Sequence, residues 1–396
     1  MANLRLIAAR SELARLNTYD DVRSQAKKRL PRMIFEFVDG GAEGEVTLRA
    51  NRESLEKVTF EPRFLSDVSD RSIHTTVLGQ QVSTPFLLAP AGLATVVHPE
   101  GELAVARAAA AAGTVFCLST ASGYPMEAVA EASNGGALWF QLYLWSREEV
   151  VLSLLDRAKA CGFSVLVLTI DVPAVGKRER DLRNGMSLPP RIRPRTALDA
   201  IRHPRWLART LTGTEVTFGN LLGVSEGDSA ASIGAYVERE LVDRGATWDR
   251  LRWLRGVWDG PIAVKGVVGV GDAERAVACG ADAVYVSNHG GRQLDSVVGT
   301  TAALPRIVEA VGDRVEVLLD GGIRRGSDVV KARALGARGV LGGRMWFHAL
   351  AADGERGVRR MLEVNAEEID RTLALLGVPQ IDAVDRACLR SEDLGA

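Results

Sequence analysis

The stretch with the clearest capacity for chemistry runs from Ser287 to Asp295 and reads Ser-Asn-His-Gly-Gly-Arg-Gln-Leu-Asp. Its histidine, His289, can accept a proton near neutral pH. Its arginine, Arg292, offers a guanidinium fork that can bind a carboxylate through two hydrogen bonds. The two glycines between them let the backbone turn sharply and approach a ligand. The pair suits proton abstraction from an acid substrate, although a capped loop whose histidine bonds only to backbone would also fit.

Short apolar, β-prone runs recur along the chain from residue 86, and one of them ends just before His289. There are eight: Phe86–Ala89, Val115–Ser119, Leu138–Leu142, Val165–Thr169, Ile262–Lys265, Ala283–Ser287, Val315–Leu319 and Gly339–Leu341. Stretches rich in Ala, Glu, Arg and Leu separate them and indicate helices, such as Glu100–Ala112, Arg147–Cys161, Asp272–Cys279 and Asp328–Leu335. Strands and helices that alternate in this number predict the α/β class and a TIM (β/α)8 barrel.

A doubly wound parallel sheet is the rival architecture. It usually carries a glycine-rich fingerprint after its first strand, but here Pro90-Ala91-Gly92 follows. The glycines between Gly266 and Gly271 do not fit the GxGxxG spacing, and they follow the fifth predicted strand. The barrel is therefore preferred.

The 396 residues fit one barrel domain with additions, so we predict a single (β/α)8 domain over residues 1–396. Residues 1–84 form an N-terminal helical cap region, in which helical spacing runs from Tyr19 to Phe37, with Pro31 at a start or kink. The helix stops at Asp39-Gly40-Gly41. Residues 175–260 form a long insertion after strand four, where a few residues would suffice.

Composition narrows the class of protein. The net charge of −1 leaves no excess of basic charge for nucleic acid. The four cysteines lie far apart without a CxxC, which predicts reduced thiols and no metal site. The sequence shows no secretory signal and no apolar run as long as a membrane span, so we expect a cytoplasmic protein.

Polar side chains stand at every predicted strand end, which is where barrels of this type place their active sites. The two last loops, Asp320 to Gly326 and Gly342 to Arg344, combine glycines with Arg324 and Arg344. Exposed backbone N–H groups and positive charge after strands seven and eight are typical of a phosphate site. A phosphate at one end of the barrel mouth and a His/Arg pair at the other suggest a phosphorylated cofactor lying across it.

With these residues assembled, the chain resembles the FMN-dependent 2-hydroxy acid oxidase and dehydrogenase family. The resemblance covers nearly the whole chain, and its most specific part is Ser287 to Asp295. Further shared motifs are Leu30-Pro31-Arg32-Met33, Gly40-Gly41-Ala42-Glu43, His98 to Glu102, Trp139 to Tyr143, Val264-Lys265-Gly266 and Asp320 to Gly326. Arg178 to Leu182 and Arg202 to Trp206 look most like the mandelate dehydrogenase branch.

The resemblance implies a role for each matched residue. His289 is the base, and Asp171 stabilises it when protonated. Tyr143, Arg178 and Arg292 hold the substrate, and Phe37 stands beside them. The residues implied to bind FMN are Ala91, Gly92, Ser119, Gln141, Thr169, Lys265, Ser287, Asp320, Gly322, Arg324, Gly343 and Arg344. The implied reaction is the oxidation of an (S)-2-hydroxy acid to the 2-keto acid, with a mandelate-like aromatic substrate as first choice, and the family's members are commonly homo-tetramers.

Two departures from the family pattern affect the expectations. Phe37 stands where a tyrosine usually bonds the substrate carboxylate, so a more apolar substrate or weaker binding is expected. Gly92 stands where the oxidases usually have alanine, which resembles the dehydrogenases and the lactate monooxygenase. Electrons would then pass to a quinone or another carrier. An oxygen-using oxidase or a lactate-type monooxygenase is the alternative, and a flavin-binding barrel without turnover is a third.

The insertion supplies a candidate partner surface. Between residues 190 and 222, basic residues alternate with apolar ones: Arg191, Arg193, Arg195, Arg202, Arg205 and Arg209 with Ile192, Leu198, Ile201, Trp206, Leu207, Leu211 and Phe218. Such a segment suits an anionic membrane surface, at the inner face of the cell membrane, where a quinone could be reached. A soluble lid over the site remains the alternative, because Asp199, Glu215, Pro204 and Gly213 interrupt a continuous amphipathic helix.

Overall fold

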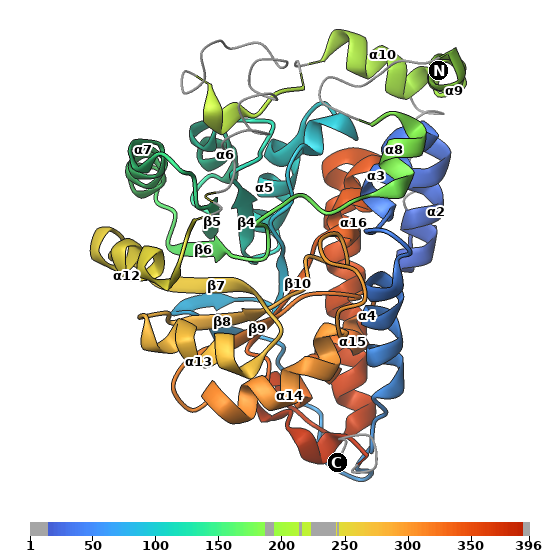
Figure 1. The fold of residues 1–396 in the computed structure, drawn as a ribbon. Coiled ribbons are helices and arrows are strands. Elements are labelled where there is room, and N and C mark those ends of the chain that lie inside the picture. Colours follow the sequence, from blue (N-terminus) through green and yellow to red (C-terminus); the bar gives the residue numbers. More distant parts are fainter. Residues whose placement is uncertain (1–14, 187–193, 214–215, 223–242, 244, 391–396) are drawn as a thin grey trace.

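The computed structural model describes residues 15–186, 194–213, 216–222, 243 and 245–390 (Figure 1). Eight parallel strands close into a barrel in the order β10-β3-β4-β5-β6-β7-β8-β9. Their bounds are β3 Phe86–Leu88, β4 Phe116–Ser119, β5 Leu138–Tyr143, β6 Val165–Thr169, β7 Ile262–Val267, β8 Ala283–Val286, β9 Glu316–Leu319 and β10 Gly339–Gly342. The predicted TIM barrel is confirmed, and each strand lies within two residues of its predicted limits.

Helices cover the outside of the barrel, because both faces of its strands are apolar. The helices that follow the strands are α5 Gly101–Ala111, α6 Met126–Ser133, α7 Glu148–Ala160, α12 Trp248–Val257, α13 Val270–Ala278, α14 Thr300–Val311, α15 Gly326–Ala334 and α16 Arg344–Leu376. Trp139, Val167 and Tyr285 point into a core inside the barrel, whereas Phe140, Leu166 and Val284 pack in the larger core beneath the helices. This alternation along each strand fixes which polar residues reach the barrel mouth.

The N-terminal cap consists of α2 Tyr19–Arg29, α3 Arg32–Asp39 and α4 Val46–Lys57. The helical spacing from Tyr19 to Phe37 is thus divided between two helices, and of the two roles expected for Pro31, a helix start and a kink, the structure has the helix start. Leu30 has an extended backbone, with φ −100° and ψ 141°, because the ring of Pro31 disfavours a helical residue before it. Pro31 is the N-cap of α3. Proline is tolerated there because the N–H that it lacks would make no hydrogen bond within the helix. The break turns α3 away from α2, and α2 lies along α16 on one side of the barrel (Figure 1).

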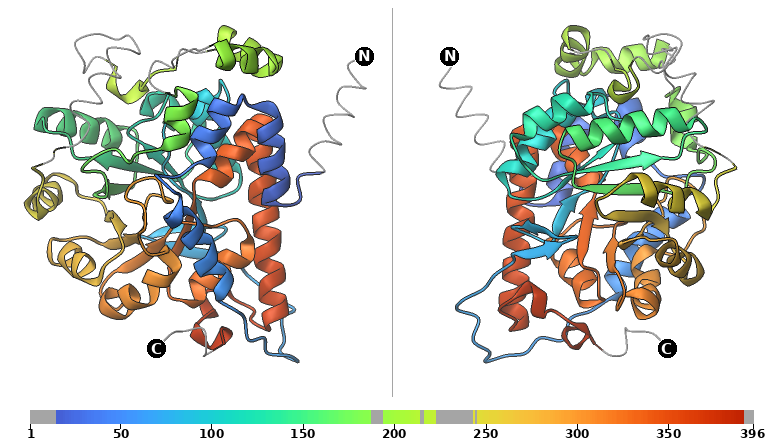
Figure 2. Two further views of the ribbon diagram at one scale, coloured as in Figure 1. Left: turned by 45° about the vertical axis from the view of Figure 1, so that its right-hand side comes forward. Right: turned by 90° about the vertical axis from the view of Figure 1, so that its left-hand side faces the viewer.

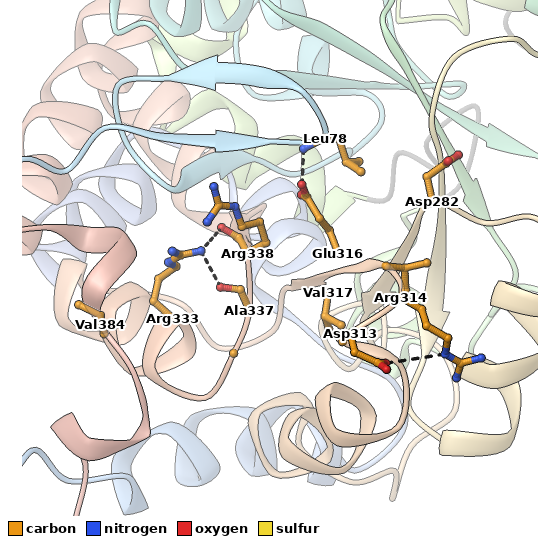
Figure 3. A pocket seen from close by; sticks show the side chains of 13 residues that line it. Leu78, Asp282, Asp313, Arg314, Glu316, Val317, Arg333, Ala337, Arg338 and Val384 are labelled. Atoms are coloured by element: carbon orange, nitrogen blue, oxygen red, sulfur yellow. Dashed lines mark hydrogen bonds and ion pairs between the residues drawn. The ribbon is translucent and has the colours of Figure 1, made fainter.

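The cap region is not purely helical, because β1 Thr75–Val77 and β2 Gln80–Val82 form an antiparallel hairpin. Val77 and Val82 pack against the inner barrel core, so the hairpin closes the end where the strands begin. An open cleft of about 550 Å3 lies beside it (Figure 3). Glu316 accepts a 2.9 Å hydrogen bond from Leu78 N there, and Arg333 donates to the carbonyl of Arg338 at 2.7 Å. Glu316 thus ties the hairpin to β9, and Arg333 holds the turn before β10, as expected at the stabilising face.

The described part of the insertion contains α8 Glu179–Asn184, α9 Pro194–Ile201, α10 Pro204–Thr212 and the 3-10 turn η2 Gly219–Leu221. The interruptions predicted at Pro204 and Gly213 are confirmed, since Pro204 starts α10 and Gly213 caps it, whereas Asp199 lies within α9. Helices α9 and α10 stand at one end of the molecule (Figure 2). The indole of Trp206 holds α10 to the turn after β3 by donating a 2.9 Å hydrogen bond to Val96 O. Arg191, Ile192, Arg193 and Glu215 lie outside the described residues.

Candidate active site

A cavity of about 420 Å3 opens at the carboxyl ends of the strands, where the parallel arrangement brings all eight strand ends together. Most of the predicted site residues line it: Phe37, Ala91, Gly92, Ser119, Tyr143, Arg178, Lys265, His289, Arg292, Asp320, Gly322, Arg324, Gly343 and Arg344. The remaining four, Gln141, Thr169, Asp171 and Ser287, lie behind this wall and hydrogen bond to it or to one another. The residues selected from the sequence therefore converge on one place.

His289 and Asp171 form a pair on this wall. Nδ1 of His289 lies 3.0 Å from Oδ1 of Asp171, and the other ring nitrogen has no hydrogen-bond partner within the described ranges. Burial opposes ionisation of Asp171, but His289 and Lys265 outweigh it, so the pKa of this carboxyl is lowered. The aspartate is thus a fixed negative charge behind an imidazole that can take a proton from the cavity.

The backbone at His289 is strained. Its φ is 57°, and the two glycines that follow, Gly290 and Gly291, have φ values of 63° and 73°. A residue other than glycine rarely adopts this left-handed conformation, which persists only when the surroundings hold it. Here Ser287 Oγ accepts a hydrogen bond from the His289 N–H at 3.1 Å. Gly291 O accepts one from the Ala42 N–H at 2.8 Å. The glycine pair in the sequence is needed for this turn, which directs the imidazole into the cavity.

Two guanidinium groups face the same part of the cavity. Arg292 donates from Nη1 to Phe37 O at 2.7 Å and to Gly40 O at 3.0 Å, which anchors it to the end of α3. Burial, together with nearby Arg178 and Arg344, lowers the pKa of Arg292 well below its usual range. Arg178 pairs through Nε with Asp181 at 3.0 Å, whereas no carboxylate in the described ranges pairs with Arg292. The two half-buried guanidinium groups can therefore stabilise a bound anion.

Tyr143 and Phe37 stand beside the arginines. Burial raises the pKa of Tyr143, so its hydroxyl keeps its proton and can donate a hydrogen bond. The ring of Phe37 lies under both cations, with its centroid 5.2 Å from Cζ of Arg292 and 5.8 Å from Cζ of Arg178. The same wall continues in apolar side chains that were not predicted: Val172, Val175, Met186 and Phe218. The anion-binding end therefore borders an apolar compartment.

A buried row of hydrogen bonds runs across the ends of β4, β5 and β6. Ser119 Oγ donates to Gln141 Oε1 at 3.0 Å, and Gln141 Nε2 donates to Thr169 Oγ1 at 3.0 Å. Asn220, from the end of the insertion, donates to the carbonyls of Ser119 and Thr120. Next to this row, buried Lys265 donates to Ser287 Oγ at 2.9 Å and lies 3.6 Å from Asp320. A planar polar ring would meet an amide, two hydroxyls and an ammonium here.

Glycines and arginines form the opposite end of the cavity, after β9 and β10. A Cβ atom on Gly343 would meet nothing nearer than Ala89 Cβ at 3.8 Å, so this position leaves room for a ligand. The Arg344 guanidinium donates to the carbonyls of Val38, Gly40 and Gly290. Among the described residues, no carboxylate pairs with the guanidinium of Arg324.

Comparisons with known proteins agree with this geometry. Residues 26–391 match the family model described as FMN-dependent dehydrogenase. The chain belongs to this family. It is 42% identical to an (S)-mandelate dehydrogenase of Pseudomonas putida, over 94% of this chain and 93% of the relative. It is also 42% identical to an L-lactate dehydrogenase of Pseudomonas syringae pv. syringae (strain B728a), over 94% of this chain and 98% of that one.

Solved structures support the same assignment. The crystal structure of the monotopic membrane protein (S)-mandelate dehydrogenase matches with a TM-score of 0.90 and 41% identity, covering 94% of this chain and 98% of that chain. A mandelate oxidase structure matches with a TM-score of 0.81 and 40% identity, covering 94% and 97%. The protein is thus an FMN-dependent 2-hydroxy acid dehydrogenase or oxidase, and the expectation of this family is confirmed.

The residues fit FMN. The hydrogen-bonded row and Lys265 suit the ring, because FMN carries both donors and acceptors along its polar edge. The open space at Gly343 and the unpaired cation of Arg324 suit a phosphate. No group of His, Cys, Asp and Glu side chains in the described ranges could hold a metal ion.

Several residues of the cavity wall were not predicted, because they do not lie at the ends of strands. Tyr19 comes from the first turn of α2, Asp181 from α8 and Phe218 from the end of the insertion. Asp181 had one available signal, since it stands three residues after Arg178, and its Oδ2 lies 3.0 Å from Arg178 Nε. Tyr19 and Phe218 reach the cavity through packing between segments far apart in the chain, for which the sequence holds no local signal.

Proposed function

We propose that the protein oxidises an (S)-2-hydroxy acid with an aromatic side chain to the 2-keto acid. The observation that carries this proposal is the convergence of the His289–Asp171 pair, two guanidinium groups and an apolar wall on one cavity. A carboxylate would bind between Arg178 and Arg292, with Tyr143 donating a further hydrogen bond. The apolar wall would then receive the substrate side chain, and Met186 and Phe218 offer a surface suited to a ring.

The proposed chemistry follows from this placement. The free ring nitrogen of His289 takes the proton of the substrate hydroxyl, and the ionised Asp171 stabilises the imidazolium that results. Bound FMN supplies the acceptor for the hydride equivalent, one hydrogen with two electrons, that C2 loses as its C–O bond becomes C=O. Arg178, Arg292 and Tyr143 fix C2 in one orientation, which lowers the barrier because the reacting atoms need not search for each other.

Anaerobic reduction of the holoenzyme tests the substrate class. (S)-Mandelate should bleach the flavin absorbance rapidly, whereas (S)-lactate and glycolate should do so more slowly at equal concentration. Bleaching by (R)-mandelate at the same rate would contradict the stereochemical part of the proposal. Fastest bleaching by glycolate would contradict the aromatic part.

We further propose that electrons leave to a quinone or another carrier and not primarily to oxygen. The support is Gly92, which the resemblance associates with the dehydrogenases. When air is admitted to the substrate-reduced enzyme, the oxidised spectrum should return slowly. Fast return with peroxide would assign an oxidase, and fast return with the decarboxylated acid would assign a monooxygenase.

We propose that α9 and α10 attach the protein to an anionic membrane surface. Leu198, Ile201 and Leu211 expose 53%, 63% and 76% of their surface. Beside them, a groove of about 1130 Å3 is lined by seven basic residues, Arg15, Lys28, Arg29, Arg202, Arg205, Arg209 and Arg356, against two aspartates, Asp21 and Asp353. Apolar and basic groups together suit the lipid interface. No helix in the described ranges is both long and apolar enough to span a membrane.

Vesicle sedimentation tests the attachment. The protein should pellet with vesicles that contain phosphatidylglycerol and much less with pure phosphatidylcholine. A variant with serine at positions 198, 201 and 211 should stay in the supernatant. Leu375→Ser on α16 is the matched control, because Leu375 is 68% exposed and lies outside the insertion. Failure of the unmodified protein to bind either vesicle would assign the segment to the lid alternative.

A further inference from the structure

The two arginines at the phosphate end of the cavity are not equivalent. Arg344 is half-buried, and its guanidinium already donates to three carbonyls, at 3.0, 2.8 and 2.7 Å. Arg324 has no ion pair, and its guanidinium has no hydrogen bond, within the described residues. Its side-chain partner is the ring of Tyr19, whose centroid lies 5.3 Å from the guanidinium carbon.

Tyr19 is held from behind. Its side chain is buried, and its hydroxyl lies 3.1 Å from Nδ1 of His348, which is completely buried. The imidazole of His348 in turn stacks on Phe35, with centroids 5.6 Å apart and an interplanar angle of 22°. Burial raises the pKa of Tyr19 to about 12 and lowers that of His348 to about 3, so the pair is neutral. The ring therefore has one fixed position below the cation.

We propose that Tyr19 is a positioning residue for FMN, because its ring holds the Arg324 guanidinium at the phosphate end of the cavity without neutralising it. An aromatic face attracts a cation through its quadrupole but carries no net charge. A carboxylate in the same place would compete with the phosphate dianion for the guanidinium. This inference rests on the proposed assignment of Arg324 to the phosphate, and the experiment below separates the two.

The experiment measures FMN release from the full-length holoenzyme by the fluorescence that appears after dilution. Arg324→Met should speed release about tenfold or more, because a charge-assisted contact is lost. Tyr19→Leu should speed release about fivefold, because a cation–π contact is lost. Tyr19→Leu added to Arg324→Met should have no further effect, since the two residues act through the same contact. The 31P resonance of bound FMN should shift in both single variants.

Two controls define the role of the ring. Tyr19→Phe keeps the ring and should release FMN close to the rate of the unmodified protein. Phe60→Leu removes a similar cation–π contact, in which the ring centroid lies 5.7 Å from Nζ of Lys331, away from the cavity, and should not change release.

The other outcomes overturn the inference in distinguishable ways. Release from Tyr19→Leu at the unmodified rate, with Arg324→Met fast, would reject Tyr19 and leave the phosphate assignment standing. Release of FMN from Arg324→Met at the rate of the unmodified protein would reject the phosphate assignment, and the inference would be rejected with it. Multiplicative effects in the double variant, or equal rates for Tyr19→Phe and Tyr19→Leu, would show that the ring does not act through Arg324.

Discussion

The Nε atom of Arg178 lies 3.0 Å from Oδ2 of Asp181, and both residues lie on the wall of the flavin cavity. An ion pair at Nε leaves the two terminal nitrogens of the guanidinium for another ligand. Asp181 thus orients the fork that we assign to the substrate carboxylate.

The consequence can be measured in two variants. Asp181→Ala should raise KM for the 2-hydroxy acid about tenfold, because a charge-assisted hydrogen bond contributes about 1.5–3 kcal/mol and only part of it acts through orientation. Asp181→Asn keeps an oxygen for Nε and should raise KM less than about threefold, with kcat close to the unmodified value in both. Equal KM values for Asp181→Ala and the unmodified enzyme would contradict the orienting role.

His289→Gln should retain FMN but lose most turnover. A positioned base contributes about 10²–10⁴-fold, and glutamine cannot take its place. The flavin absorbance of the purified variant and the rate of anaerobic reduction by (S)-mandelate check both parts. A variant that reduces at the unmodified rate would eliminate His289 as the base.

Asp171→Asn should lower kcat/KM at least about tenfold, because the amide offers no negative charge to the imidazolium that forms as His289 takes the substrate proton. The folded-state pKa of Asp171 is lowered from 3.8, so the carboxylate also contributes to stability above that value, and this contribution is lost only as the pH falls through the lower one. Steady-state kinetics at neutral pH check the loss of activity, with thermal melting as the control for folding. An unchanged kcat/KM would contradict the pairing.

Phe37→Tyr should lower KM for (S)-mandelate, by a factor that corresponds to about 0.5–1.5 kcal/mol for one added hydrogen bond. The new hydroxyl would stand on a ring that already lies 5.2 Å from Arg292 and 5.8 Å from Arg178. Phe37→Leu is the matched control, and it should raise KM because it removes both cation–π contacts. Steady-state kinetics at fixed pH decide the matter, and an unchanged or higher KM in Phe37→Tyr would refute the expectation.

Gly92→Ala should destabilise the protein by about 1–3 kcal/mol, because the added methyl overpacks a tight contact. A Cβ atom at this position would lie 2.6 Å from Cβ of Ala121 and 2.6 Å from its carbonyl oxygen. Thermal melting of the holoenzyme checks the loss. Ala121→Gly in the same chain should recover only part of it, since the carbonyl clash remains, and full recovery would show that the backbone shifts freely.

The barrel could be predicted because its strands are buried on both faces and read as unbroken apolar runs. β6 has the limits expected, Val165–Thr169. For the first helical segment, the apolar spacing continues through Pro31, so the spacing could not decide whether Pro31 kinks one helix or starts a second one. Spacing reports which faces are buried, whereas the break at Leu30 depends on the local sterics of the residue before proline.

The site also contains residues that could be predicted from the sequence and contacts that could not. Side chains at strand ends, such as Lys265 and His289, could be selected because the fold brings strand ends to one rim. The backbone carbonyls at the end of α3 that accept hydrogen bonds from Arg292 and Arg344 could not be predicted. Every residue has a carbonyl, so the sequence does not mark the ones that form these contacts. Tyr19 reaches Arg324 only because α2 packs along α16.

The contact between Gly92 and Ala121 also bears on how this enzyme could change over generations. If an alanine at position 92 favours reaction with oxygen, a lineage acquires it at a cost in stability, because the methyl overpacks against Ala121 and its carbonyl. A movement or substitution near residue 121 would recover part of that stability. The reserve of stability that a dehydrogenase of this shape holds therefore bears on whether it can change into an oxidase.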